Sequence, residues 1–234
     1  MSGEVVLSLG IIYGGMAVHI LLLAALLAHS SLAPGSRHVY LSLAIAPMIR
    51  ILSLSMPLAR VPLVYWYVII GIPVFIAAFV VARLTGYGFR KIGANINNLA
   101  LQLIFSLSGI GLGYIEYNIL RPPPLVENTG LVYMLLTAVI LLVFTGFLEE
   151  LVFRGIMLSA LRGLFSDKVA VLMSSTVFAA LHITYKVPLD TLFVFVVGLL
   201  FSLAVIRFRS ILGVSLAHGL TNISMFIVFP FILN

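Results

Sequence analysis

The run of residues 147–155 is apolar except for three charged side chains, Glu149, Glu150 and Arg154. On a helix, Glu150 and Arg154 are four residues apart and share one face, so they can form an ion pair. Glu149 points about 100° away from that face, and we expect its carboxylate to be the free one. A buried carboxylate can serve as a general base or acid. The same cluster can also be read as a structural ion pair that only locks helices together.

Two further polar groups lie in later apolar runs. His182 follows Phe178 by four residues, and His218 and Asn222 are themselves four residues apart, which places them on one helix face. That face therefore carries two hydrogen-bonding groups among apolar residues. Taken singly, each of these side chains is more typical of a hydrogen bond between membrane helices.

The amino-acid composition indicates whether these polar groups lie in a soluble protein or in a membrane. The chain has 234 residues, of which 62% are hydrophobic and only 9% are charged, and its mean hydropathy is +1.24. A soluble domain carries about a quarter of charged residues. We therefore expect an integral membrane protein. The absence of cysteine excludes disulfides, thiolate metal ligands and a cysteine nucleophile. The net charge of +6 is small and indicates a topology signal rather than nucleic-acid binding.

The apolar runs predict an all-α polytopic transmembrane helical bundle, folded as a single integral membrane domain over residues 1–234. Helices are the only spanning structures that such uninterrupted runs support. We expect about eight spans, at residues 5–28, 39–58, 62–82, 99–114, 131–165, 168–184, 191–206 and 211–233. The first run has no preceding Lys or Arg and is long enough to span, so we interpret it as a retained helix rather than a signal peptide.

Two runs have features that bear on packing. Gly109 and Gly113 have the spacing that lets another helix approach closely. Residues 131–165, at about 1.5 Å per residue, are longer than a bilayer core of about 30 Å. This helix is therefore either steeply tilted, or it breaks near Gly155 and continues along the interface.

The distribution of Lys and Arg between loops predicts an orientation. With the N-terminus outside, most loop cations fall on the cytoplasmic side and few on the outer side. Both termini are then non-cytoplasmic. The cytoplasmic set is Arg37, Arg83, Arg90, Lys91, Arg162, Lys168, Arg207 and Arg209, and the outer set is Arg60, Arg121 and Lys186.

Three motifs follow one another along the chain, Glu-Glu-x-x-x-Arg, then Phe-x-x-x-His, then His-x-x-x-Asn. In this order and spacing the sequence resembles the CPBP family of intramembrane proteases, which includes the CAAX prenyl proteases of the Rce1 type and bacteriocin-processing and immunity proteins. The resemblance covers residues 147–234. We therefore expect four N-terminal spans without a motif in residues 1–130 and a catalytic four-span core in residues 131–234.

The resemblance implies an intramembrane endopeptidase and assigns roles to the motif residues. Glu149 is implied to be the general base and His182 its partner in activating a water. His218 and Asn222 are implied to form the oxyanion hole. This division suits amide hydrolysis, which needs a deprotonated water and donors aimed at the oxyanion.

The resemblance leaves Glu150 and Arg154 as structural support. The expected substrate is a hydrophobic or lipid-modified protein that enters laterally from the bilayer, and the expected location is the cell membrane, plasma or inner. Nothing in the sequence names the substrate further.

Metal dependence stays open at this point. Glu149, His182 and His218 are also a complete ligand set for catalytic zinc, with a fourth position left for water. Against zinc, the histidines lie on separate helices without a local His-Glu-x-x-His pair, and Asn222 suits an oxyanion donor better than a zinc ligand. We favour glutamate chemistry without a metal or other cofactor, with zinc as the alternative.

Two other classes of function compete with the protease. One is a non-catalytic membrane scaffold of the same fold, and the other is a transporter with a buried charged pathway. Arg50, beside Pro47 in the second run, bears on both. It can bind a substrate carboxylate, but we favour a structural role in which it neutralises Glu116 or caps carbonyl groups freed near Pro47.

Overall fold

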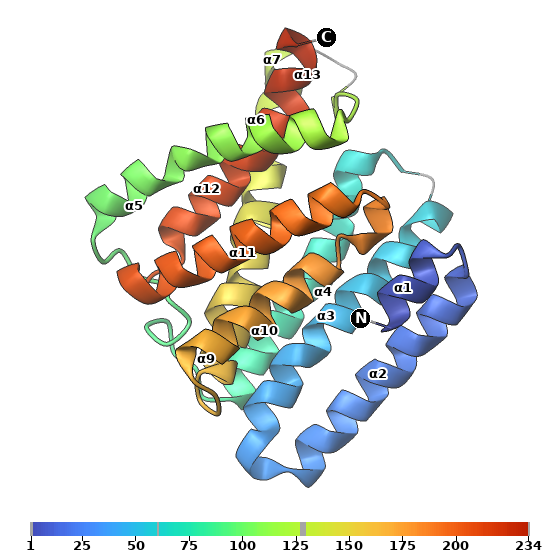
Figure 1. Ribbon diagram of the computed structural model, residues 1–234, viewed down its shortest axis with the longest axis vertical. Helices are drawn as coiled ribbons and strands as arrows, with labels where there is room; N and C mark the ends of the chain where they lie inside the picture. Colours follow the sequence, from blue (N-terminus) through green and yellow to red (C-terminus); the bar gives the residue numbers. More distant parts are fainter. Residues whose placement is uncertain (1, 60, 127–129, 234) are drawn as a thin grey trace.

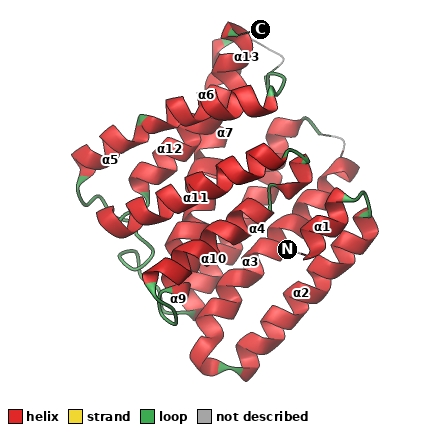
Figure 2. Ribbon diagram, viewed as in Figure 1, coloured by secondary structure: helices red, strands yellow, loops and turns green. Residues whose placement is uncertain are grey.

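The computed structural model describes residues 2–59, 61–126 and 130–233. Within these residues the chain consists of helices and connecting loops, without strands (Figure 2). Eight helical stretches are long and apolar enough to cross a membrane. The protein is therefore an all-α polytopic integral membrane protein, and the predicted fold class is confirmed.

The helical elements follow one another in a single bundle (Figure 1). In chain order they are α1 (Ser2–Ser8), α2 (Ile12–Leu32), η1 (Pro34–Ser36), α3 (Arg37–Ser55), η2 (Met56–Ala59), α4 (Leu63–Leu84), α5 (Leu99–Ser106), α6 (Ser108–Leu120), α7 (Leu131–Leu141), η3 (Leu142–Phe147), α8 (Leu148–Glu150), η4 (Leu151–Met157), α9 (Leu158–Leu161), α10 (Asp167–Ala180), η5 (Ile183–Tyr185), α11 (Pro188–Phe208), α12 (Leu212–Ile223), η6 (Ser224–Val228) and α13 (Phe229–Ile232).

The first apolar run is not one spanning helix, so the prediction for residues 5–28 was wrong in its bounds. The short helix α1 ends at Ser8, the chain reverses at Gly10, and the spanning helix α2 begins at Ile12. Gly10 has φ +85°, a backbone conformation that glycine adopts without steric cost. The reversal packs α1 against α2 and against η5. A hydropathy pattern cannot predict this turn, because apolar residues flank it on both sides.

The fifth run crosses the bundle without a break, which decides between the two predicted alternatives. Residues Leu131–Leu161 form one continuous helical stretch of 31 residues. Gly155 marks a close approach rather than a break, because a Cβ at this position would lie 2.9 Å from the carbonyl oxygen of Ile92. Two segments of this stretch, η3 and η4, are π-helical and flank the short helix α8 that carries both glutamates. Such π-helical turns occur frequently at functional sites.

Glycines bring α6 and η3 to close contact with α12. A Cβ on Gly109 would collide with the carbonyl of Ala217, and one on Gly113 would lie 2.6 Å from the carbonyl oxygen of Thr221. The close approach predicted from the spacing of Gly109 and Gly113 is therefore confirmed. Gly146 in η3 is equally tight, since a Cβ there would lie 2.7 Å from the backbone nitrogen of Gly219.

Candidate functional site

The Glu-Glu-x-x-x-Arg segment forms the predicted ion pair. Nη1 of Arg154 donates to Oε1 of Glu150 at 3.0 Å, and the two residues are 1% and 0% exposed. The Arg154 guanidinium also lies over the Phe178 ring, 4.2 Å from its centroid. A buried ion pair needs such additional contacts because its desolvation is costly. The pair thereby connects the fifth span to α10, which leads to His182.

Glu150 has a second partner that the sequence analysis did not predict. Its Oε1 lies 2.9 Å from Nδ1 of His218 on α12. An ionised carboxylate only accepts hydrogen bonds, so Nδ1 of His218 is the donor. The other ring nitrogen, Nε2, then faces Glu149, with 3.9 Å between Nε2 and Oε2. Glu150 therefore fixes the ring that stands beside the free glutamate.

His182 lies just after α10, at the N-terminal end of η5. Its Nδ1 is 3.1 Å from the carbonyl oxygen of Phe178. Because a carbonyl only accepts, this nitrogen donates its proton and leaves Nε2 of the neutral ring as a proton acceptor. In both histidines Nδ1 therefore forms a hydrogen bond that fixes the ring, and Nε2 is the ring nitrogen left to interact with water or substrate.

Asn222 is held by a residue that sequence reasoning missed. Its Nδ2 donates to Oγ1 of Thr145 at 2.8 Å, and Thr145 in turn donates to the carbonyl of Leu141. The second N–H of the Asn222 amide remains available. A signal for Thr145 was present in the sequence, because it is a polar residue four positions before Glu149 in an apolar run.

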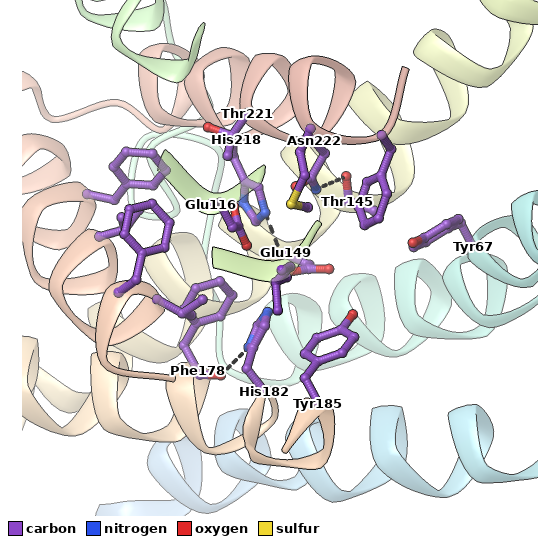
Figure 3. Close-up of a pocket in the computed structure, with 17 residues that line it drawn as sticks. Tyr67, Glu116, Thr145, Glu149, Phe178, His182, Tyr185, His218, Thr221 and Asn222 are labelled. Atoms are coloured by element: carbon purple, nitrogen blue, oxygen red, sulfur yellow. Dashed lines mark hydrogen bonds and ion pairs between the residues drawn. The ribbon is translucent and has the colours of Figure 1, made fainter. Parts of the chain in front are cut away.

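The four candidate residues, Glu149, His182, His218 and Asn222, line a single cavity (Figure 3). The cavity has a volume of about 80 Å³. At about 30 Å³ per water it holds a few waters but not a peptide. Other polar residues in its wall are Tyr67, Glu116, Thr145, Tyr185 and Thr221.

Among the residues of the cavity wall, Glu116 belongs to none of the three sequence motifs. It comes from α6, in the half of the chain without motifs, and is 8% exposed. The sequence analysis named it only as a partner for Arg50. In Figure 3 its carboxyl lies beside His218 and Glu149, so the N-terminal spans contribute a functional group to the cavity.

Arg50 does not pair with Glu116, and that prediction was wrong. Its Nε donates to Oε1 of Glu4 at 2.8 Å, and its Nη2 donates to the carbonyl of Leu181. Glu4 belongs to α1. The sequence analysis did not predict the chain reversal that places α1 beside α2. Arg50 is not among the residues that line the cavity. It instead ties α1 and α3 to the residue that precedes His182.

In the described part of the chain, no three His, Asp or Glu side chains are grouped closely enough to hold a metal ion. Glu149, His182 and His218 share a cavity wall but do not converge as a ligand set in this conformation. Zinc therefore stays an alternative for chelation to test.

A comparison with known protein families identifies part of the chain. Residues 131–224 match the family model described as Type II CAAX prenyl endopeptidase Rce1-like. The match includes Glu149, His182, His218 and Asn222. No curated protein and no solved structure matches the chain significantly.

Proposed function

Because residues 131–224 match the Type II CAAX prenyl endopeptidase Rce1-like family model, we propose that the protein is an intramembrane endopeptidase. It hydrolyses a peptide bond of a hydrophobic or lipid-modified protein substrate. The observation that carries the proposal is the shared cavity. A carboxylate, two imidazoles and an amide all line it, although they come from three different spans.

The first half of the reaction forms the nucleophile. A water held between Glu149 and Nε2 of His182 loses a proton to the Glu149 carboxylate, and its oxygen attacks the carbonyl carbon of the scissile peptide. Arg154 forms its ion pair with Glu150 and not with Glu149. The Glu149 carboxylate can therefore accept the proton. General-base catalysis of this kind contributes about 10²–10⁴ in rate.

The second half stabilises and resolves the tetrahedral intermediate. The carbonyl oxygen becomes an oxyanion, and the free N–H of Asn222 donates to it. Nε2 of His218 can donate as well when the ring carries both protons, because Nδ1–H is committed to Glu150. Glu149 then returns its proton to the amide nitrogen as the C–N bond breaks, which releases the amine. No step requires a metal ion.

The membrane setting supports the substrate class. A cavity of about 80 Å³ is too small for a peptide, so the surrounding helices must separate to admit one. Such an opening faces the bilayer, where hydrophobic and prenylated proteins reside. We therefore place the substrate in the membrane, entering laterally.

The test is proteolysis by the purified protein in detergent. The substrates are hydrophobic peptides in matched prenylated and unmodified forms. Glu149→Gln keeps the shape of the side chain but removes the base, so we expect cleavage to fall about a hundredfold or more. Thermal unfolding of the variant should stay near that of the wild type, since the contact of Glu149 with Nε2 of His218 is long, at 3.9 Å.

Each arm of this experiment has a distinct meaning. Cleavage that survives a zinc chelator but not Glu149→Gln supports the glutamate mechanism, and cleavage abolished by the chelator supports zinc. Equal cleavage by the wild type and Glu149→Gln would overturn the proposed mechanism. If neither protein cleaves any peptide and both unfold at the same temperature, a substrate outside the panel is favoured over a scaffold that needs the charge of Glu149 for packing.

A further inference from the structure

A basic cleft is lined by residues from the loop between α4 and α5, from the region of α9 and from the end of α11. Figure 1 shows these segments together at one edge of the bundle. We define it by its four outer cations, Arg90, Lys91, Arg162 and Arg209. Its volume of about 520 Å³ falls within the usual range of ligand sites. The deeper Arg154 also borders the cleft, but its guanidinium is engaged by Glu150 and Phe178.

Three of the four outer cations lack a counter-charge. Arg162 is neutralised by Asp167, through bonds of 2.7 and 3.0 Å to the two carboxylate oxygens. Arg90, Lys91 and Arg209 form no ion pair within residues 2–59, 61–126 and 130–233. All three are exposed at the cleft. The cleft therefore has an unbalanced positive charge, which suits an anion.

The backbone beneath these cations is held by specific hydrogen bonds. Oγ of Ser159 donates to the carbonyl of Lys91 at 2.8 Å, and Nδ2 of Asn95 donates to the carbonyl of Arg209 at 2.6 Å. The backbone N–H of Ile211 also donates to the carbonyl of Gly93 at 2.9 Å. Cations that serve only as a topology signal require no such arrangement, because charge in a loop is sufficient. The cleft is thus pre-organised.

The surroundings of the cleft favour a lipid over a free anion. A second hollow shares Ile206 and Arg209 with the cleft and adds Arg207 and Leu203. Leu203 is the last member of an exposed apolar row along one face of α11, whose other members are Leu192, Val196 and Leu200. This row runs along α11 from near its start to the cations at its end. An acyl chain below a bound headgroup would follow this path.

We propose that the basic cleft binds the phosphate headgroup of an anionic phospholipid whose acyl chains lie along the exposed face of α11. Arg90, Lys91 and Arg209 contact the phosphate. Basic pockets between membrane helices are suited to anionic headgroups, which are enriched in the cytoplasmic leaflet. The predicted orientation places the cleft on that side.

The test measures lipid-dependent stability of the full-length protein in a neutral detergent. Phosphatidylglycerol should raise the thermal unfolding temperature, because a ligand that binds only the folded state stabilises it. Phosphatidylcholine with the same acyl chains should have little effect. In Arg90→Gln/Arg209→Gln we expect roughly thirtyfold weaker binding of phosphatidylglycerol, about fivefold per cation.

Arg121→Gln is the matched control for this variant. Arg121 and Arg209 both end a helix in the left-handed conformation, with φ values of 46° and 56°, but Arg121 lies at the end of α6, outside the cleft. It should keep the full response to phosphatidylglycerol. An equal response to phosphatidylcholine, an equal loss in Arg121→Gln, or the full shift from glycerophosphate without acyl chains would overturn the proposal. The readout requires no enzymatic activity, so it is independent of the proposed protease function.

Discussion

The side chains of the candidate site are oriented through the atoms that face away from the cavity. His182 and His218 each hold Nδ1 in a hydrogen bond to an acceptor, a backbone carbonyl in one case and Glu150 in the other. Because each Nδ1 is committed, both rings present Nε2 to the reacting groups. Asn222 follows the same principle through Thr145. At this scale the supporting residue decides what each candidate group can donate or accept.

Thr145 gives a direct test of that orientation. In Thr145→Val the side chain keeps its shape but loses the oxygen that accepts from Asn222, so the amide is no longer held. We expect kcat to fall roughly five- to tenfold, the equivalent of about 1 kcal/mol of hydrogen bonding. Thr145→Ser keeps the hydroxyl and should retain most of the activity. Wild-type kcat in Thr145→Val, measured with a cleavable peptide, would contradict a positioning role.

At the scale of elements, glycines set the distance between the helices that meet at the cavity. The helix pair α6 and α12 approaches at Gly109 and Gly113, where only a hydrogen fits against the opposing carbonyl groups. The contact brings Glu116 on α6 beside His218 on α12. The π-helical segments η3 and η4 have a related effect within the fifth span, since they change the angular spacing of side chains on either side of Glu149 and Glu150.

Gly109→Ala tests the helix contact, and Gly111→Ala is its control on the same helix. The new methyl group of Gly109→Ala collides with the Ala217 carbonyl, so we expect a loss of about 1–3 kcal/mol in stability, typical of overpacking. Around Gly111 no atom lies within 4 Å of a Cβ. Gly111→Ala should therefore unfold at the wild-type temperature or slightly above it, because alanine has the higher helix propensity. Similar unfolding temperatures for both variants would show that the contact is not tight.

At the scale of the whole molecule, the two halves of the chain have unequal sequence signals but share the cavity. The family match covers residues 131–224, whereas Tyr67 and Glu116 in the cavity wall come from earlier spans. The helix α1 adds a second contribution, since Glu4 holds Arg50 and Arg50 holds the Leu181 carbonyl. The N-terminal spans therefore complete the site and do not merely enclose it.

The orientation of the protein in the membrane stays a prediction, and the absence of cysteine makes it simple to test by labelling. Because the sequence contains no cysteine, a single introduced cysteine reports the accessibility of one position. Ser166→Cys should react with an impermeant thiol reagent from the cytoplasmic side, and Pro123→Cys from the opposite side, since the loop cations place these exposed positions on opposite faces. Labelling in the reverse pattern would invert the predicted topology and place the basic cleft on the outer face.

The sequence by itself determined the features that depend on local composition and spacing. Hydropathy determined the all-α membrane bundle and its eight spans, because apolar length alone decides whether a helix can cross. Helical periodicity determined the Glu150–Arg154 pair, since both partners lie on one helix. The order of the motifs indicated the family. These features require no knowledge of which helices are neighbours.

Only the tertiary structure decided how distant segments meet. It turned α1 into the bundle at Gly10, paired Arg50 with Glu4 rather than Glu116, and joined His218 to Glu150. The physical reason is that a buried charge is stabilised by whichever opposite charge the fold brings near it, at any separation along the chain. In an apolar sequence several pairings satisfy the same composition, and helix packing selects among them.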